Sequence, residues 1–116
     1  MTGISPETLA LLATEWFKAA NRAVRLAQEV APARLERERA RISYSAGRIS
    51  DALAAHGLRM HEFDGQPYSP ALPPEPVNPE DFGSEEGLVV QETVEPTVLC
   101  NGRVLLRGKI VLAKGA

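Results

Sequence analysis

Few side chains of this sequence have the types and spacing that catalysis or metal binding requires. The two histidines, His56 and His61, lie on either side of Gly57, so they do not share one helical face at the spacing of metal ligands. The single cysteine, Cys100, stands among apolar neighbours, where a buried thiol without an adjacent base is unreactive. Neither residue type points to a metal centre or to a nucleophile.

Charged residues are distributed unevenly along the chain. Residues 1–61 contain nine bases and six acids, residues 62–102 contain nine acids and no base, and residues 103–116 contain four bases. The acids at positions 85, 86, 92 and 95 are typical of a solvated surface rather than of a magnesium site. We therefore expect a binding protein, not an enzyme, and we expect no metal site and no cofactor.

Four arginines in the first half of the chain could contact the phosphates of a nucleic acid. They alternate with glutamates, however, and such a mixture on a helix is typical of a solvated face. Nucleic acid is therefore the less favoured partner. The four residues are Arg34, Arg37, Arg41 and Arg48.

A helix is predicted from about residue 6 to residue 31. Ser5-Pro6-Glu7 supplies a capping side chain, a proline at the first helical position and an acid in the first turn. Apolar residues then recur at alternating spacings of three and four, which is the pattern of a coiled coil. The series is Leu9, Leu12, Trp16, Ala19, Ala23, Leu26 and Val30.

Two readings of this apolar series are open. An amphipathic helix can pack on its own protein, but a chain of this size offers a long helix little surface on which to lie. Pairing of two copies is therefore favoured. We expect a homodimer interface formed by Leu9, Leu12, Trp16, Ala23, Leu26 and Val30.

A second helix is predicted over about residues 33–56. Pro32 lacks an amide donor and crowds the preceding turn, so a kink or short break is expected near Ala31. Gly57 is a natural stop after the helix. The apolar face of this helix is expected to contain Leu35, Ile42, Ala46, Ile49 and Leu53.

Prolines dominate the middle of the chain. Six of the nine prolines lie between Pro67 and Pro79, in a stretch that cannot form a helix or a central strand and must run extended over a surface. A rigid connection is the favoured reading, and recognition by an SH3-like partner is the alternative.

The last third of the chain reads as strands. Apolar residues at positions 88–90 and 94 suggest one strand, and residues 97–100 and 103–106 suggest a hairpin. Asn101-Gly102 between them supplies the two positive φ angles of a type I′ turn. Gly108 then permits a bend before a last strand over 109–114, with Ile110 and Leu112 on one face.

The predicted fold is α+β. It consists of a helical dimerisation region over 1–60, a proline-rich acidic connection over 61–86 and a small β module over 87–116. No segment has the length and apolar character of a membrane span, and the first residues lack the signature of a signal peptide. With one cysteine, the chain suits a reducing compartment, and we expect it to be cytoplasmic and not attached to a membrane.

Taken together, these elements resemble the GrpE nucleotide exchange factors of DnaK-type chaperones. Residues 56–58 (His-Gly-Leu) and 64–70 (Asp-Gly-Gln-Pro-Tyr-Ser-Pro) are similar to the family passage of a helix, Gly-Val and then Gly-Glu-Pro-Phe-Asp-Pro. Residues 87–90 are similar to its Pro-Gly-x-Val strand entry. Residues 99–114 are similar to its closing Leu-x-Gly-Arg-Val-Leu-Arg-Pro-Ala-x-Val-x-Val-x-Lys, so the resemblance covers about residues 33–114.

The sequence also departs from the family pattern. The proline stretch replaces the family's His-Glu-Ala-Val passage, and Pro96-Thr97 stands where the family has Gly-Tyr. Cys100 is an inserted residue, and Arg107-Gly108-Lys109 replaces Arg-Pro-Ala.

The resemblance implies a homodimeric co-chaperone that binds the ATPase domain of a DnaK-type chaperone through its β module and promotes ADP release. Arg103 and Leu112 match contact positions of the family, and Arg107 and Lys109 are further basic candidates. The alternative is a scaffolding adaptor with this architecture but no exchange activity, which docks another protein through its proline stretch and acidic belt. The belt contains Glu75, Glu80, Asp81, Glu85 and Glu86.

Overall fold

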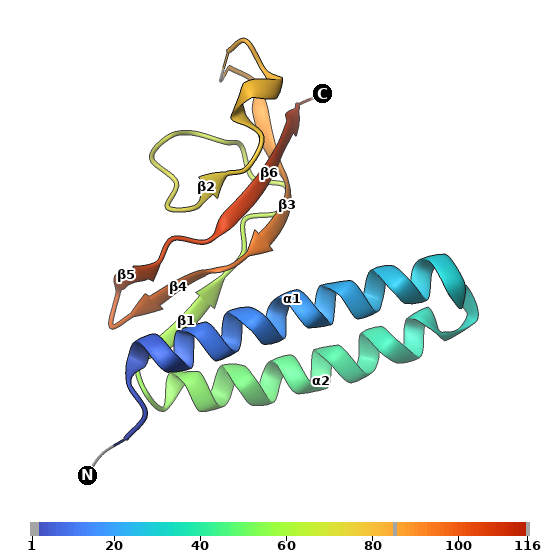
Figure 1. Cartoon of the computed structure of the whole chain (residues 1–116), viewed down its shortest axis with the longest axis vertical. Helices are drawn as coiled ribbons and strands as arrows, with labels where there is room; N and C mark the ends of the chain where they lie inside the picture. The colour runs from blue at the N-terminus through green and yellow to red at the C-terminus, as the bar shows by residue number, and fades with distance from the viewer. Residues whose placement is uncertain (1–2, 85, 116) are drawn as a thin grey trace. The chain divides into compact units, whose positions relative to one another are not determined.

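The chain has an α+β fold, with two helices followed by six short strands (Figure 1). The computed structural model describes residues 3–84 and 86–115. The chain divides into two compact units, one that ends at Arg59 and one that begins at Met60. We call them the helical unit and the β unit.

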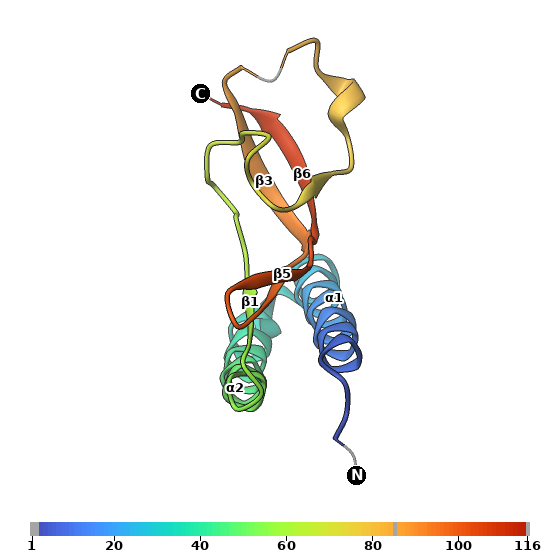
Figure 2. The same cartoon turned by 90° about the vertical axis from the view of Figure 1, so that its left-hand side faces the viewer.

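The helical unit is a hairpin of α1 (Pro6–Val30) and α2 (Leu35–Ala54), which lie side by side and run in opposite directions (Figures 1 and 2). The predicted start of α1 is confirmed, because the Ser5 hydroxyl accepts a hydrogen bond from the Thr8 N–H at 3.1 Å. Around Pro32 the chain reverses rather than kinks. A short 3-10 turn, η1 (Pro32–Arg34), joins the two helices, and Ala31 before it has non-helical dihedral angles.

The buried face of α1 differs from the predicted coiled-coil series. Leu12, Leu26 and Val30 are 57%, 58% and 73% exposed, while Leu9 and Trp16 are half-buried. Most of the buried positions instead follow a position of the predicted series by one residue, and most carry small side chains. They are Ala10, Ala13, Thr14, Phe17, Ala20 and Ala27. Alanines repeat with the same helical period as the larger residues, so periodicity alone did not distinguish the two faces, and a coiled coil is not confirmed.

The apolar face predicted for α2 is at least partly buried at every position. Leu53 is fully buried, and Leu35, Ile42, Ala46 and Ile49 are half-buried. After the helix, the Gly57 N–H donates to the Ala54 carbonyl at 3.0 Å, and Gly57 has a φ of 77°. The predicted stop at Gly57 is therefore confirmed, since this left-handed conformation suits glycine.

The six strands form two three-stranded sheets. One has the order β1-β4-β5 and contains β1 (Leu58–His61), β4 (Thr97–Cys100) and β5 (Arg103–Leu106). The other has the order β2-β6-β3 and contains β2 (Glu75–Pro76), β6 (Lys109–Lys114) and β3 (Leu88–Glu95). β6 pairs antiparallel with β3 and parallel with β2.

The predicted hairpin and the bend after it are both confirmed. Asn101 and Gly102 have φ angles of 51° and 84° and join β4 to β5. Gly108 has a φ of 83°, and a Cβ added there would lie 2.5 Å from the Glu95 carbonyl oxygen. Gly108 is thus required both by its own conformation and by the close backbone opposite it.

The proline-rich segment is part of the β unit rather than a separate connection. Backbone hydrogen bonds join Gly65 and Gln66 to Val90, and Tyr68 to Leu88, so the segment first follows the outer edge of β3. Its later part contains β2 and the short 3-10 helix η2 (Pro79–Asp81). The prediction that this stretch runs extended over a surface is only partly correct, because it bends repeatedly, forms η2 from Pro79 and buries Pro74. Its prolines do avoid the central strand β6.

The core of the β unit draws on this segment. Five residues form its buried cluster, namely Phe63, Leu88, Val90, Ile110 and Leu112, and Tyr68, Leu72 and Phe82 pack against it. Ile110 and Leu112 share the buried face of β6, as the alternation of that strand predicts. The strands of residues 87–116 alone would have left this face open, so the large side chains of residues 61–86 complete the core.

Candidate protein-binding surfaces

The tip of the β4–β5 hairpin projects an adjacent cation and apolar side chain. Arg103 begins β5 directly after the turn, and both Arg103 and Val104 are exposed, Val104 by 48%. β5 is also the last strand of its sheet, so its outer backbone edge is not paired within the described chain. Sequence analysis selected Arg103 but missed Val104. Alternation along a strand with one buried face does not indicate two successive exposed residues, and here both faces of β5 are exposed at the hairpin tip.

The two other basic candidates lie on the connection from β5 to β6. Arg107 is exposed, and its Nε donates to the Pro73 carbonyl at 3.0 Å. Its guanidinium Nη1 also lies 3.9 Å from a carboxylate oxygen of Glu75. Lys109 is exposed at the start of β6 and pairs in register with Glu75 and Glu95. Arg107 therefore holds the proline-rich segment as well as carrying charge.

Leu112 lies apart from these three cations. Its side chain is 3% exposed and belongs to the core cluster, because it points to the same face of β6 as Ile110. Its backbone is held on both sides by Asn78, whose amide donates to the Leu112 carbonyl at 3.0 Å and accepts from the Leu112 N–H at 2.9 Å. In this structure Leu112 supports the sheet and is not presented at its surface with Arg103.

The histidines and the cysteine are not brought together. His56 is exposed after α2. The centre of the His61 ring lies 4.6 Å from the centre of the Phe63 ring, and the two ring planes are tilted by 57°. Cys100 is half-buried beside the hairpin turn. Residues 3–84 and 86–115 contain no cluster of three or more histidine, cysteine or acidic side chains suited to a metal ion. Of the acids considered for magnesium, Glu85 lies outside the described residues.

One carboxyl group of the β unit has a shifted pKa. Glu62 keeps an exposed surface, but partial burial of its carboxyl raises its pKa, and the neighbouring charge of Asp64 raises it further. His61 opposes this shift. Asp64 itself accepts a hydrogen bond from the Thr93 N–H at 2.9 Å, which ties this turn to β3.

Three of the six residues expected at a dimer interface line a shallow apolar hollow of the helical unit. Leu9, Leu12 and Trp16 of α1 line it together with Ile49 and Leu53 of α2, and its volume is about 200 Å³. Leu26 and Val30 are exposed further along the same flank of α1. Ala23, which lies between Trp16 and Leu26 in the sequence, is also exposed.

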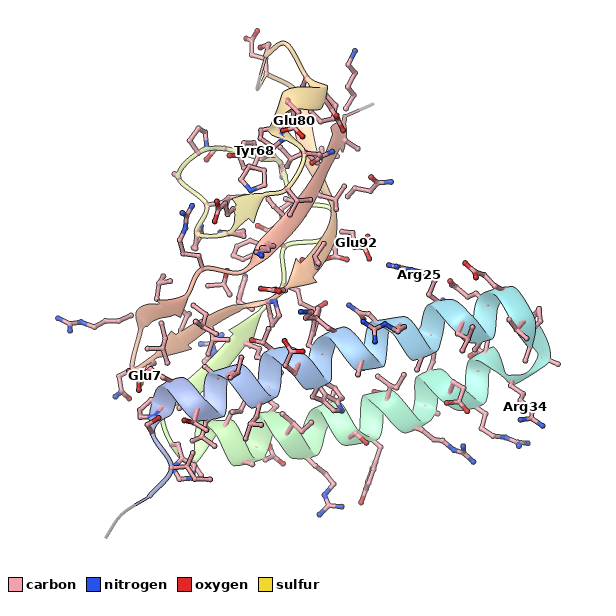
Figure 3. All side chains as sticks on the ribbon, in the orientation of Figure 1. Glu7, Arg25, Arg34, Tyr68, Glu80 and Glu92 are labelled. Atoms are coloured by element: carbon pink, nitrogen blue, oxygen red, sulfur yellow. The ribbon has the colours of Figure 1, made fainter. Side chains whose placement is uncertain are left out.

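The arginines considered for nucleic-acid binding are all exposed on η1 and α2. Figure 3 labels Arg34 at the turn between the helices. Arg41 lies 3.4 Å from a carboxylate oxygen of Glu38, and the Arg48 guanidinium lies 5.9 Å from the centre of the Tyr44 ring. Two of these four cations therefore interact with neighbours on their own helix.

Neither α1 nor α2 combines the length and the hydropathy of a membrane-spanning helix, and no other helix of the described chain does. The geometry of the β unit offers an exposed, cationic and partly apolar hairpin tip, which suits contact with another protein. In comparisons with known proteins, no family model, curated protein or solved structure matches the chain.

Proposed function

We propose that this protein is a GrpE-like co-chaperone. In this proposal the β unit binds the ATPase domain of a DnaK-type chaperone and promotes the release of ADP. The protein performs no bond chemistry of its own. It binds more tightly to the chaperone conformation with an open nucleotide cleft, and this difference in affinity shifts the equilibrium toward nucleotide release.

The observation that carries the proposal is the exposed pair at the hairpin tip. Arg103 and Val104 are successive residues at the start of an edge strand, so their exposed side chains leave opposite faces of β5. A partner that surrounds the hairpin tip can contact the cation on one face and the apolar side chain on the other. The turn that presents them has the two positive φ angles of a rigid two-residue connection. Because the tip is already ordered, binding does not lose the conformational entropy of ordering a loop.

The order of the elements also supports the proposal. A pair of helices precedes a unit of six short strands whose final hairpin carries Asn101-Gly102-Arg103, which is the arrangement that the resemblance implies. In this proposal Arg107 and Lys109 extend the positive surface. Leu112 maintains β6 from within the core.

We propose further that the working form is a homodimer located in the cytoplasm. The exposed flank of α1, with Leu12, Leu26 and Val30, is the surface that two copies would cover. The alternating arginines and glutamates of α2 would then remain in solvent.

The test is release of a fluorescent ADP analogue from DnaK-type chaperones, measured by stopped flow with and without this protein. The native chain should accelerate release, and Arg103→Ala should remove most of the acceleration, on the order of tenfold. Arg39→Ala, an exposed arginine of α2, is the matched control and should behave as the native chain.

Two outcomes would contradict the proposal. The first is that the native chain accelerates release from none of the chaperones. The second is that Arg103→Ala and Arg39→Ala lose activity equally, which would show that the hairpin tip has no special part in exchange.

A further inference from the structure

We infer that a groove of the β unit binds an extended peptide segment in which an apolar side chain is flanked by lysines or arginines. The groove consists of two adjoining hollows, of about 210 and 390 Å³. Phe82, Gly83, Ser84 and Leu88 line both hollows, so the two form one continuous depression. Two adjoining hollows can hold successive side chains of an extended peptide.

Apolar and aromatic residues make up most of the lining of the first hollow, although part of its surface is polar. Tyr68, Pro76 and Phe82 make its walls, and Leu88 and Leu112 of the core cluster contribute to its floor. The wall is held in place by Asn78, which makes two hydrogen bonds to the backbone of Leu112 and one from its amide to Asp81 at 3.2 Å. A preformed hollow of this size, lined mainly by apolar and aromatic residues, accepts one large apolar side chain with little ordering cost.

The charges beside the groove select the flanking residues of the ligand. Glu80 and Asp81 stand exposed on η2, directly between two wall residues, Pro79 and Phe82. Figure 3 labels Glu80 on this short helix and Tyr68 in the groove wall. Glu86 and Lys114 both line the second hollow, and Lys114 is the one base among the described residues that line either hollow. This acidic rim complements lysines or arginines on both sides of an apolar anchor.

The inference is independent of the proposed exchange function. The groove includes none of the exposed hairpin residues Arg103, Val104, Arg107 and Lys109, and it prefers a basic ligand whereas the hairpin tip prefers an acidic one. The β unit would therefore contact two partners of opposite charge, or two regions of one partner.

The probe is a fluorescein-labelled peptide of sequence Gly-Ser-Lys-Lys-Trp-Lys-Lys-Ser-Gly, whose binding to the full chain is followed by fluorescence anisotropy. Two control peptides replace the tryptophan by alanine or all lysines by glutamate. The parent peptide should bind about tenfold more tightly than either control. Raising the salt from about 50 mM to about 300 mM should weaken its binding several-fold.

Substitutions at two separate glycines provide a test variant and its matched control. Gly83 lines both hollows, has no positive φ, and a Cβ added there meets no atom within 4 Å, so Gly83→Leu adds a large side chain beside both hollows without strain. Gly47→Leu on α2 adds the same side chain at another unobstructed glycine. Gly83→Leu should weaken peptide binding about tenfold, whereas Gly47→Leu should leave it unchanged.

A second pair tests the acidic rim. Glu80→Gln combined with Glu86→Gln should weaken binding several-fold at low salt, while Glu29→Gln combined with Glu36→Gln on the exposed helices should not. Absence of binding by the parent peptide would overturn the inference. Equal affinities of Gly83→Leu and Gly47→Leu, or equal binding of the lysine and glutamate peptides, would overturn it as well.

Discussion

The helical unit and the β unit bury their apolar side chains in opposite ways. In the β unit, large residues such as Val90, Ile110 and Leu112 are 1%, 0% and 3% exposed. In α1, most buried positions are alanines, while Leu12 and Val30 remain more than half exposed. The β unit therefore buries its large apolar side chains against one another, whereas the helical unit retains an exposed apolar flank that a second copy can cover.

The two units also differ in how far apart their contacting residues lie in the sequence. The helical hairpin is closed by one short turn, so its helices meet soon after they form. In the β unit, Phe63 packs with residues of β3 and β6, and Asn78 forms a hydrogen bond with Leu112, 34 residues further along the sequence. Loss of one core residue in the β unit should therefore be felt by several distant segments at once.

The largest effect is expected for Ile110→Ala. Ile110 is fully buried in the core cluster, so the substitution should lower the free energy of unfolding of the β unit by about 3–4 kcal/mol. Denaturant titration followed by circular dichroism measures this loss. Val104→Ala, at a half-exposed position, is the control and should cost less than about 1 kcal/mol. Equal losses at both positions would break the contrast between core and surface.

Trp16→Ala tests the apolar flank of the helical unit. Because the Trp16 ring lines the hollow beside Leu12, its removal should weaken association of two copies by about 3 kcal/mol. Sedimentation equilibrium measures the dissociation. Tyr44→Ala removes an aromatic ring that is 69% exposed on α2 and should leave the mass unchanged. A native chain that sediments as a monomer at all concentrations would refute the pairing.

Gly108→Ala examines the joint between β5 and β6. The new methyl group would require a strained positive φ and would collide with the backbone at Glu95 and Pro96, so unfolding should become easier by about 2 kcal/mol. Thermal unfolding of Gly83→Ala, at a glycine without either constraint, provides the comparison. If the two alanine variants melt together, the close approach at Gly108 has no energetic importance.

The smallest effect concerns Glu62 and pH. Its pKa is raised above 4.5 in the folded state, so between 4.5 and the raised value the folded chain binds more protons than the unfolded chain. Stability contributed by this group is therefore lost as the pH rises through that window. Glu62→Gln should flatten this part of the pH profile of unfolding and leave the chain slightly more stable at pH 7 than the native one.

Glu29→Gln, on the exposed part of α1, is the control for this experiment. Its pH profile should follow that of the native chain. A native profile that Glu62→Gln leaves unaltered would show that the carboxyl of Glu62 does not couple to folding.

Several elements were determined by short-range sequence. Ser5-Pro6-Glu7 started α1, Gly57 stopped the turn after α2, and Asn101-Gly102 made the hairpin, because each depends on dihedral preferences and hydrogen bonds within a few residues. The alternation of β6 likewise determined that Ile110 and Leu112 share a face. The two helices and the strands from residue 88 onward, and hence the α+β class, followed from these local signals, whereas β1 and β2 were not predicted.

Other features were decided only by the tertiary structure, because they depend on competition between distant segments for the same surface. Two faces of α1 had nearly the same periodicity, and packing buried the one with alanines rather than the one with Leu12 and Leu26. Proline content predicted an extended segment but not that its aromatic residues would complete the core. The same packing buried Leu112 and left Arg103 and Val104 exposed, so burial against remote residues determined which strand positions are available to a partner.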